Sequence, residues 1–265
     1  MTVLIDQRGG VAVVTVSDPA RRNALTQELS GRLAQAVATC DRDESVRAIV
    51  ITGAPPAFCA GGDLGAIAAA GEAGSVADMH RIYRGFIAVA NASVPTIAAV
   101  NGPAVGAGLN LALACDLRLV GPGARFDARF LQLGIHPGGG MTWLAQRAVG
   151  SQVAAAMTLF GEQLNAQEAV RTGLAYRLVD IGGDDPRSPG AHETVVAAAV
   201  AFAQRTAAAS RDLVLTTKAT LQATARMAEY ADAVDHETGP QLASLRSAAF
   251  LQMVRSRAGS RPDAR

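Results

Sequence analysis

Short apolar runs alternate along the chain with segments that have helical spacing. Residues 11–16 (VAVVTV) and 48–52 (AIVIT) are rich in β-branched residues and predict strands. The second strand should be buried on both faces, because only its last residue is polar. Between the two strands an apolar residue recurs at every fourth position, which predicts a helix: Leu25, Leu29, Leu33 and Val37. Thr26 or Asn23 could cap the start of that helix.

The same alternation continues as far as residue 180. In chain order the pattern predicts a helix, a strand, a second helix and another strand: residues 76–91, 95–100, 109–116 and 117–120. A helical segment over residues 151–173 and a late strand over residues 176–180 follow. Strands that alternate with helices in this way indicate the α/β class with a largely parallel sheet.

The clearest break in the pattern is the segment 182–192 (GGDDPRSPGAH), which is polar and contains two prolines and three glycines. It predicts a surface linker between a core over residues 1–181 and a helical region over residues 193–265. Within that helical region an apolar face predicts a contact between subunits: Leu242, Leu245, Ala249 and Val254.

The composition limits the kinds of molecule that the protein is expected to bind. Hydrophobic residues make up 49% of the 265 positions and charged residues 18%, which supports a large core and argues against disorder. A formal net charge of +1 argues against nucleic-acid binding, and no apolar run reaches the roughly 18 residues of a membrane span. Three cysteines without metal-like spacing predict free thiols and no metal site. The first residues also lack the pattern of a secretory signal, so we expect a cytoplasmic location.

Two glycine-rich turns are the strongest candidates for a functional site. Residues 57–63 (AFCAGGD) and 101–108 (NGPAVGAG) each follow a predicted strand and precede a helical segment. Such turns lie at the edge of an α/β sheet where ligands bind, and glycine lets the backbone approach a ligand closely. Either turn alone is compatible with an ordinary tight turn. Together, two N–H groups that converge on one oxygen would form an oxyanion hole, which stabilises developing negative charge.

Seven segments in the same order carry a resemblance to a known family. They are RRNALT, IVITG, AFCAGGDL, VPTIAAVNGPAVGAG, LALACDLRL, LGIHPGGGMTWLAQRAVG and AVRTGLAYRLVD. With them the chain resembles the enoyl-CoA hydratase/isomerase (crotonase) superfamily. The resemblance implies a spiral of β-β-α turns, followed by helices that pack on neighbouring subunits in a homotrimer or hexamer. It also implies an acyl-CoA ligand and no cofactor beyond the coenzyme A of the substrate.

The same resemblance assigns backbone donors and a path for the ligand. The oxyanion donors would be the N–H groups of Gly62 and Ala107. Coenzyme A would lie along residues from two segments: Asn23, Ala24, Leu25, Ala60 and Asp63. Asp63 could instead cap the helix that follows the first turn.

Three positions depart from the pattern of the resembled family. Asn110 and Phe130 stand where its hydratases carry two glutamates, and Gly138 stands where its dienoyl-CoA isomerases and aryl-CoA dehalogenases carry an aspartate. Asparagine does not titrate, and phenylalanine cannot hydrogen-bond. Acid–base groups typically contribute about 10²–10⁴-fold each. We therefore expect Asn110 and Phe130 to line the acyl site and ordinary enoyl-CoA hydration to be weak.

Other side chains are candidates for the chemistry or the pocket. His136 carries an imidazole, which could move a proton or could simply bind a backbone carbonyl. Asp127 and Arg129 are either an ion pair that lines the pocket or a solvated pair on a turn. Tyr83, on the helix after the first turn, could face the pocket, and Trp143 suggests an apolar acyl site. Both aromatic residues could equally be ordinary packing.

These residues leave three functions open. The first is an acyl-CoA-binding protein of the enoyl-CoA hydratase/isomerase type that polarises the thioester carbonyl and has an isomerase-like, thioesterase-like or otherwise altered activity. The second is a non-catalytic acyl-CoA carrier or sensor. The third is an enoyl-CoA hydratase with a substitute base such as Asp127 or His136.

Overall fold

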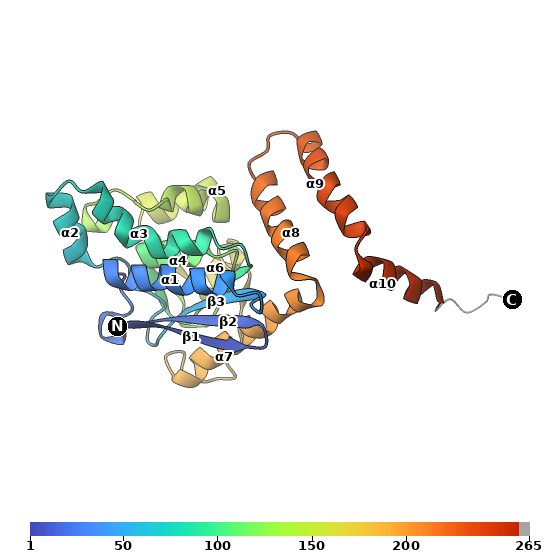
Figure 1. The fold of residues 1–265 in the computed structure, drawn as a ribbon. Helices are drawn as coiled ribbons and strands as arrows, with labels where there is room; N and C mark the ends of the chain where they lie inside the picture. Colours follow the sequence, from blue (N-terminus) through green and yellow to red (C-terminus); the bar gives the residue numbers. More distant parts are fainter. Residues whose placement is uncertain (260–265) are drawn as a thin grey trace. The chain divides into compact units, whose positions relative to one another are not determined.

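The computed structural model describes residues 1–259 (Figure 1). These residues form two compact units, the first of which ends at Ala208. The centre of the first unit is a six-stranded sheet in the order β1-β2-β3-β4-β6-β9. Its strands are β1 (Thr2–Arg8), β2 (Val11–Ser17), β3 (Ala48–Gly53), β4 (Thr96–Val100), β6 (Leu117–Val120) and β9 (Arg177–Leu178). All neighbouring strands pair in parallel except β1 and β2, so the prediction of a largely parallel sheet is confirmed.

The strands form where the apolar runs stand in the sequence. β3 is buried at every position, as its pattern predicts, and so is β4. β1 was not predicted from the sequence. Its side chains are mostly exposed, because it lies at the edge of the sheet and pairs on one side only.

Helices cover both faces of this sheet, with α1, α3 and α4 on one face and α7 on the other (Figure 1). The Thr26 hydroxyl caps α1 by accepting a hydrogen bond of 3.0 Å from the Leu29 N–H, so Thr26, and not Asn23, is the cap. The helices on the first face are α1 (Gln27–Arg42), α3 (Val76–Ala90) and α4 (Ala107–Ala114). The first unit contains five further helices before α7: η1 (Pro19–Arg21), α2 (Leu64–Glu72), η2 (Leu131–Leu133), α5 (Met141–Leu159) and α6 (Ala166–Arg171).

A second, smaller sheet was not predicted, because its strands are too short to show a pattern. It consists of β5 (Pro103–Val105), β7 (Arg125–Asp127) and β8 (Leu164–Asn165) in the order β5-β7-β8. β5 lies inside the second glycine turn and pairs in parallel with β7, while β8 pairs antiparallel with β7. This sheet therefore brings residues of the second turn next to β7, about 20 positions further along the chain, with β8 on the far side of β7.

The boundary predicted at residues 182–192 is wrong. The loop ends at Ser188, whose hydroxyl accepts from the Ala191 N–H at 3.0 Å and caps α7 (Pro189–Ala203). α7 and η3 (Gln204–Ala208) belong to the first unit. The apolar side of α7 packs on the main sheet through Ala191, Val195, Val196, Ala199, Val200 and Ala203. Removing these side chains from water stabilises the sheet, so the division between the units comes only after Ala208.

In the second unit, from Ala209 onward, every secondary-structure element over the described residues is a helix. Its helices are α8 (Arg211–Thr224), α9 (Tyr230–Leu245) and α10 (Ala248–Gly259). The helical pattern predicted from residue 193 agrees with α7 to α10, but α7 and η3 belong to the first unit, and residues 260–265 of the predicted region lie outside the described residues. Over residues 1–259, no helix has both the length and the hydropathy needed to cross a lipid bilayer.

We expect His192, in the first turn of α7, to make the free energy of unfolding depend on pH. Burial lowers the pKa of His192 below its ordinary value of 6.5; Arg8 lowers it further, and Glu193 opposes the shift. The unfolded chain therefore binds the proton more readily, so stability should fall as pH drops below about 6.5. Urea titrations from about pH 7.5 to about pH 5.5 measure this slope. His192→Gln should flatten it, whereas His236→Gln, at an exposed position, should not.

Candidate functional site

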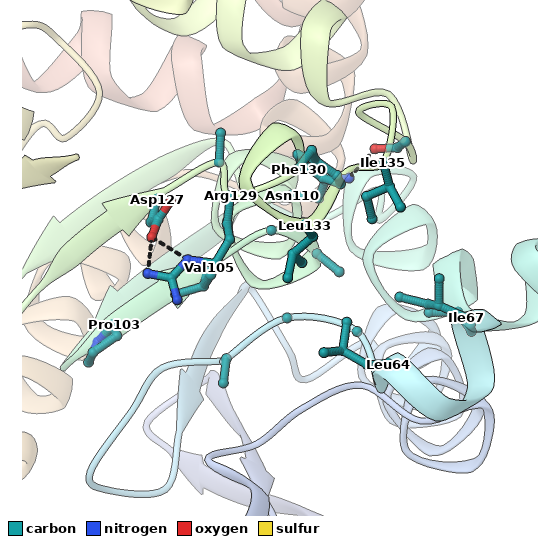
Figure 2. A pocket seen from close by; sticks show the side chains of 18 of the residues that line it. Leu64, Ile67, Pro103, Val105, Asn110, Asp127, Arg129, Phe130, Leu133 and Ile135 are labelled. Carbon is teal, nitrogen blue, oxygen red and sulfur yellow. Dashed lines mark hydrogen bonds and ion pairs between the residues drawn. The ribbon is translucent and has the colours of Figure 1, made fainter. Parts of the chain in front are cut away.

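A cavity of about 560 Å³ lies between the first glycine turn, the start of α4 and the chain that follows β7. Figure 2 shows that the lining has a charged side and an apolar side. Asp127 and Arg129 lie on one side of the view, and Leu64, Ile67 and Ile135 lie on the other. Both predicted oxyanion donors and both positions that replace the glutamates line this one cavity: Gly62, Ala107, Asn110 and Phe130.

The first turn places the peptide between Gly61 and Gly62 beside the cavity. The Leu25 N–H donates to the Gly61 carbonyl at 2.7 Å, and the Leu25 carbonyl accepts from the Asp63 N–H at 3.0 Å. In a trans peptide the C=O and the following N–H point in opposite directions. Because the Gly61 carbonyl points at Leu25, the Gly62 N–H of the same peptide points away from Leu25, and Gly62 lines the cavity.

The second turn supplies another N–H group. Ala107 is the first residue of α4, and the N–H groups in the first turn of a helix have no intrahelical acceptor. Gly106 before it has φ +52°, a conformation that glycine adopts without strain. A Cβ atom placed on Gly61 would lie 3.9 Å from the Ala107 nitrogen and 3.0 Å from the Val105 carbonyl oxygen. The two turns therefore approach each other at the positions of the predicted donors.

Backbone hydrogen bonds join the two turns. The Cys59 N–H donates to the Pro103 carbonyl at 3.1 Å, and the Cys59 carbonyl accepts from the Val105 N–H at 3.0 Å. A Cβ atom on Gly108 would lie only 2.0 Å from the Cys59 carbonyl oxygen. Glycine at this position thus lets α4 pack directly on the first turn, and this packing fixes one donor relative to the other.

Asn23 and Leu25 hold the first turn from behind. The Asn23 Nδ2 donates to the carbonyls of Ala54 at 2.7 Å and Ala57 at 2.8 Å, and its Oδ1 accepts from the Asp18 N–H at 2.8 Å. Both Asn23 and Leu25 are 0% exposed. The prediction that these two residues bind the ligand is therefore wrong for their side chains, because they are buried in the support of the turn.

The other residues predicted along the ligand path differ in position. Ala60 lines the cavity, and Ala24 is half-buried outside it. The Asp63 carboxylate accepts from the Ala66 N–H at 2.9 Å and caps α2. The capping interpretation of Asp63 is confirmed.

Asn110 and Phe130 are the two residues predicted to stand where the family's hydratases carry glutamates. Asn110 is 1% exposed, and its Nδ2 donates to the carbonyls of Gly138 at 2.9 Å and Gly139 at 3.1 Å. Its Oδ1 is buried without a partner. Phe130, just before η2, presents an apolar ring to the same cavity. Neither side chain can move a proton at the reacting atoms.

The small sheet forms one wall of the cavity with alternate residues. Side chains of a strand point to opposite faces in turn, so one set faces the cavity and the other faces the core. The core-facing residues, Ala104 and Phe126, are both 0% exposed. The cavity-facing residues are Pro103, Val105, Arg125, Asp127 and Gln163.

Asp127 is a buried carboxylate in that wall, with 3% of the residue exposed. Its Oδ2 accepts from the Arg129 Nε at 2.7 Å, from the Arg129 Nη2 and from the Gln163 Nε2 at 3.1 Å. Arg129 itself is half-exposed and has φ +55°, a strained conformation for this residue. The pair lines the pocket, so the interpretation as a solvated turn is wrong for Asp127.

His136 and Tyr83 also line the cavity. The His136 ring is exposed, and its Nδ1 lies 2.7 Å from the Pro137 carbonyl oxygen, the arrangement expected of a backbone contact. Tyr83 projects from α3, and a Cβ atom on Gly138 would lie 2.6 Å from its hydroxyl. Burial raises the pKa of Tyr83, so its phenol stays protonated and can donate a hydrogen bond.

Trp143 does not line this cavity. It lies on α5, is 49% exposed, and the Arg147 guanidinium lies 3.7 Å from the centre of its ring. The prediction that Trp143 forms an apolar acyl pocket is therefore not met within the chain, because the side chain turns toward solvent. Apolar residues from α2, α3 and the loop after β7 line the cavity instead: Leu64, Ile67, Met79, Ile82, Leu133 and Ile135.

Three polar cavity residues, Arg22, Arg125 and Gln163, were missed in the sequence. A strand of three residues gives too little alternation to show that Arg125 shares a face with Asp127. Among the described residues, no group of three or more histidine, cysteine or acidic side chains could hold a metal ion. Burial raises the pKa of Cys59 to about 12, so this thiol beside the site is not a nucleophile near neutral pH.

Comparison with known proteins identifies the family of the chain. Residues 6–239 match the family described as enoyl-CoA hydratase/isomerase. The chain is 49% identical over 253 residues to a probable enoyl-CoA hydratase of Mycobacterium tuberculosis, which covers 94% of each chain. It is 35% identical over 175 residues to 1,2-epoxyphenylacetyl-CoA isomerase of Escherichia coli, which covers 64% of this chain and 67% of that protein.

Solved structures show the same fold. A probable enoyl-CoA hydratase/isomerase from Mycobacterium abscessus superimposes with a TM-score of 0.83 at 30% identity, covering 99% of this chain and 97% of that one. An enoyl-CoA hydratase from Bacillus anthracis gives a TM-score of 0.87 at 23% identity, covering 98% and 97%, which supports the fold alone. The chain therefore has the crotonase fold and belongs to the enoyl-CoA hydratase/isomerase family.

Proposed function

We propose that the protein binds an acyl thioester of coenzyme A and polarises its carbonyl between the N–H groups of Gly62 and Ala107. The observation that carries this proposal is the Gly61–Gly62 peptide, whose N–H points away from Leu25 while Gly62 lines the cavity beside the start of α4. Two such donors stabilise the negative oxygen that forms when a thioester becomes an enolate. By analogy with other oxyanion holes, losing one donor costs about 3–4 kcal/mol.

The reaction that follows should not be efficient addition of water. Asn110 and Phe130 cannot take or give a proton. Asp127 is a carboxylate in the cavity wall, but its Oδ2 already accepts a hydrogen bond from Arg129. We therefore propose an isomerase-like or otherwise altered conversion through the same enolate, in which the imidazole of His136, which also lines the cavity, would take the α-proton and return it to the acyl group. The similarity to a CoA thioester isomerase of Escherichia coli is compatible with this chemistry.

Hydration of crotonyl-CoA should be at least about 10⁴-fold slower than in a hydratase with two glutamates, since each acid–base group typically contributes about 10²–10⁴-fold. Loss of the enoyl thioester absorbance measures the rate. Asp127→Asn tests whether this carboxylate serves as a substitute base. Ordinary hydratase rates in the wild type would show that the roles inferred for Asn110 and Phe130 are wrong.

A direct test of the oxyanion hole uses the bound thioester itself. The infrared band of the carbonyl in butyryl-CoA should shift to lower frequency on binding, because two hydrogen bonds weaken the C=O bond. Free coenzyme A serves as the control for binding without a carbonyl. Binding with an unshifted carbonyl band would leave a carrier or sensor, the alternative function, as the better description.

We also propose that the second unit joins copies of the chain. In α9 and α10 the apolar side chains predicted for a subunit contact are exposed: Leu242 at 48%, Leu245 at 39% and Val254 at 45%. The family resemblance suggests a homotrimer or hexamer, and light scattering at micromolar concentration would detect it. None of the three cysteines forms a disulfide within the described residues, in keeping with a proposed cytoplasmic location.

A further inference from the structure

Two buried side-chain oxygen atoms, both on residues that line the cavity, have no hydrogen-bond partner. Across the described residues, only three buried side-chain N or O atoms lack one: the Oδ1 of Asn110, the Oδ1 of Asp127 and the Nδ1 of His192. The first two belong to residues that line the same cavity, and His192 lies elsewhere on α7. A buried polar atom without a partner costs free energy, so two acceptors in one cavity indicate a ligand that supplies donors.

Asp127 is fixed so that one of its oxygens is left without a hydrogen-bond partner. Its Oδ2 receives hydrogen bonds from both Arg129 and Gln163, which hold the carboxylate against the wall. Only 3% of the residue is exposed, so bulk water does not solvate Oδ1. Asp127 lies opposite Val105 in the pairing of β7 with β5, and its carbonyl accepts from the Gly106 N–H at 2.9 Å. It is therefore a close neighbour of the turn that carries the Ala107 donor.

Asn110 presents its oxygen for a similar reason. The Nδ2 donates to two carbonyls, those of Gly138 and Gly139, so reversing the amide would place its oxygen against two other acceptors. The orientation is thereby fixed, and Oδ1 is the atom left without a partner. The cavity thus carries two fixed acceptors in a lining that is otherwise largely apolar, as Figure 2 shows for Leu64, Ile67, Leu133 and Ile135.

We propose that Asp127 determines specificity, and that the acyl group of the ligand carries a hydroxyl that donates a hydrogen bond to Asp127 Oδ1. This inference rests on the proposed function, because it places the hydroxyl on the acyl part of a CoA thioester. The Asn110 Oδ1 is a second acceptor for a donor on the same group. An acyl group that is only hydrocarbon would leave the carboxylate oxygen buried and unpaired, and a site built for a hydroxyl rejects such an analogue.

Calorimetry with matched thioesters tests this specificity. The probes are butyryl-CoA and three hydroxybutyryl-CoA compounds with the hydroxyl on the second, third or fourth carbon. In the wild type, at least one hydroxylated thioester should bind roughly 10- to 100-fold more tightly than butyryl-CoA. In Asp127→Ala this preference should fall to about twofold or less. Asp180→Ala removes a carboxylate far from the cavity lining, and it should keep the preference.

The outcomes separate this inference from the proposed function. If butyryl-CoA and all three hydroxylated thioesters bind within twofold of one another, the assignment to Asp127 is overturned while acyl-CoA binding stands. A preference that survives in Asp127→Ala also overturns it. If no thioester binds at all, the proposed function itself fails. The comparison in the wild type remains decisive even where Asp127→Ala does not fold.

Discussion

Replacing Ala107 by proline should lower turnover of a CoA thioester by about 100- to 1,000-fold while the fold is kept. Proline has no N–H, so the change removes one of the two proposed donors, and its ring fills part of the space beside the carbonyl oxygen. The first position of a helix is where proline is best tolerated, because the lost N–H has no partner within the helix. The residue before it is glycine, which relieves the steric restriction that proline imposes on its predecessor.

The matched control for this change is Ala107→Gly, which keeps the N–H group at the same position. It should retain turnover within a few-fold of the wild type, and its bound thioester should show the same carbonyl infrared shift. Circular dichroism and urea unfolding verify that Ala107→Pro is folded. If the folded proline variant turned over the thioester at the wild-type rate, Ala107 would not be an oxyanion donor.

The second large effect is expected at Gly108, where alanine should destabilise the protein by about 3 kcal/mol or more. A Cβ atom there would lie 2.0 Å from the Cys59 carbonyl oxygen and 2.8 Å from its carbonyl carbon. Both are backbone atoms that a side-chain rotation cannot move, so α4 and the first glycine turn would have to separate. Because these two elements carry the two proposed donors, activity should fall together with stability.

Gly31→Ala in α1 is the appropriate control for this substitution. A Cβ atom there would meet nothing within 4 Å, and Gly31 lies inside a helix. Alanine should therefore be neutral or stabilise the helix by about 0.5–1 kcal/mol. Urea unfolding compares the two variants at one pH. Equal unfolding midpoints for Gly108→Ala and the wild type would mean that the turns are not packed as closely as the structure shows.

Much of the first unit follows from local patterns in the sequence. Each apolar run that predicted a strand in the large sheet formed one within two or three residues of its predicted ends, and Thr26 caps α1. Burial periodicity produces this agreement, because a segment that must bury one face or both adopts the element that does so. The predicted domain boundary at residues 182–192 was wrong because a local pattern does not show where the next element packs. Turn-forming residues at 182–188 mark a loop, but they do not show that the next helix returns to the same core.

The sequence by itself determined that two glycine turns follow strands, and it predicts that Asn110 and Phe130 stand where the hydratases of the family carry acids. Only the tertiary structure decided that Asn23 supports the turn, that Trp143 faces solvent and that Asp127 is buried with one oxygen free. Composition and spacing describe neighbours along the chain, whereas hydrogen-bond partners are set by the pairing of distant strands. Gln163 reaches Asp127 across 36 residues because β8 pairs with β7, and no local pattern encodes that meeting.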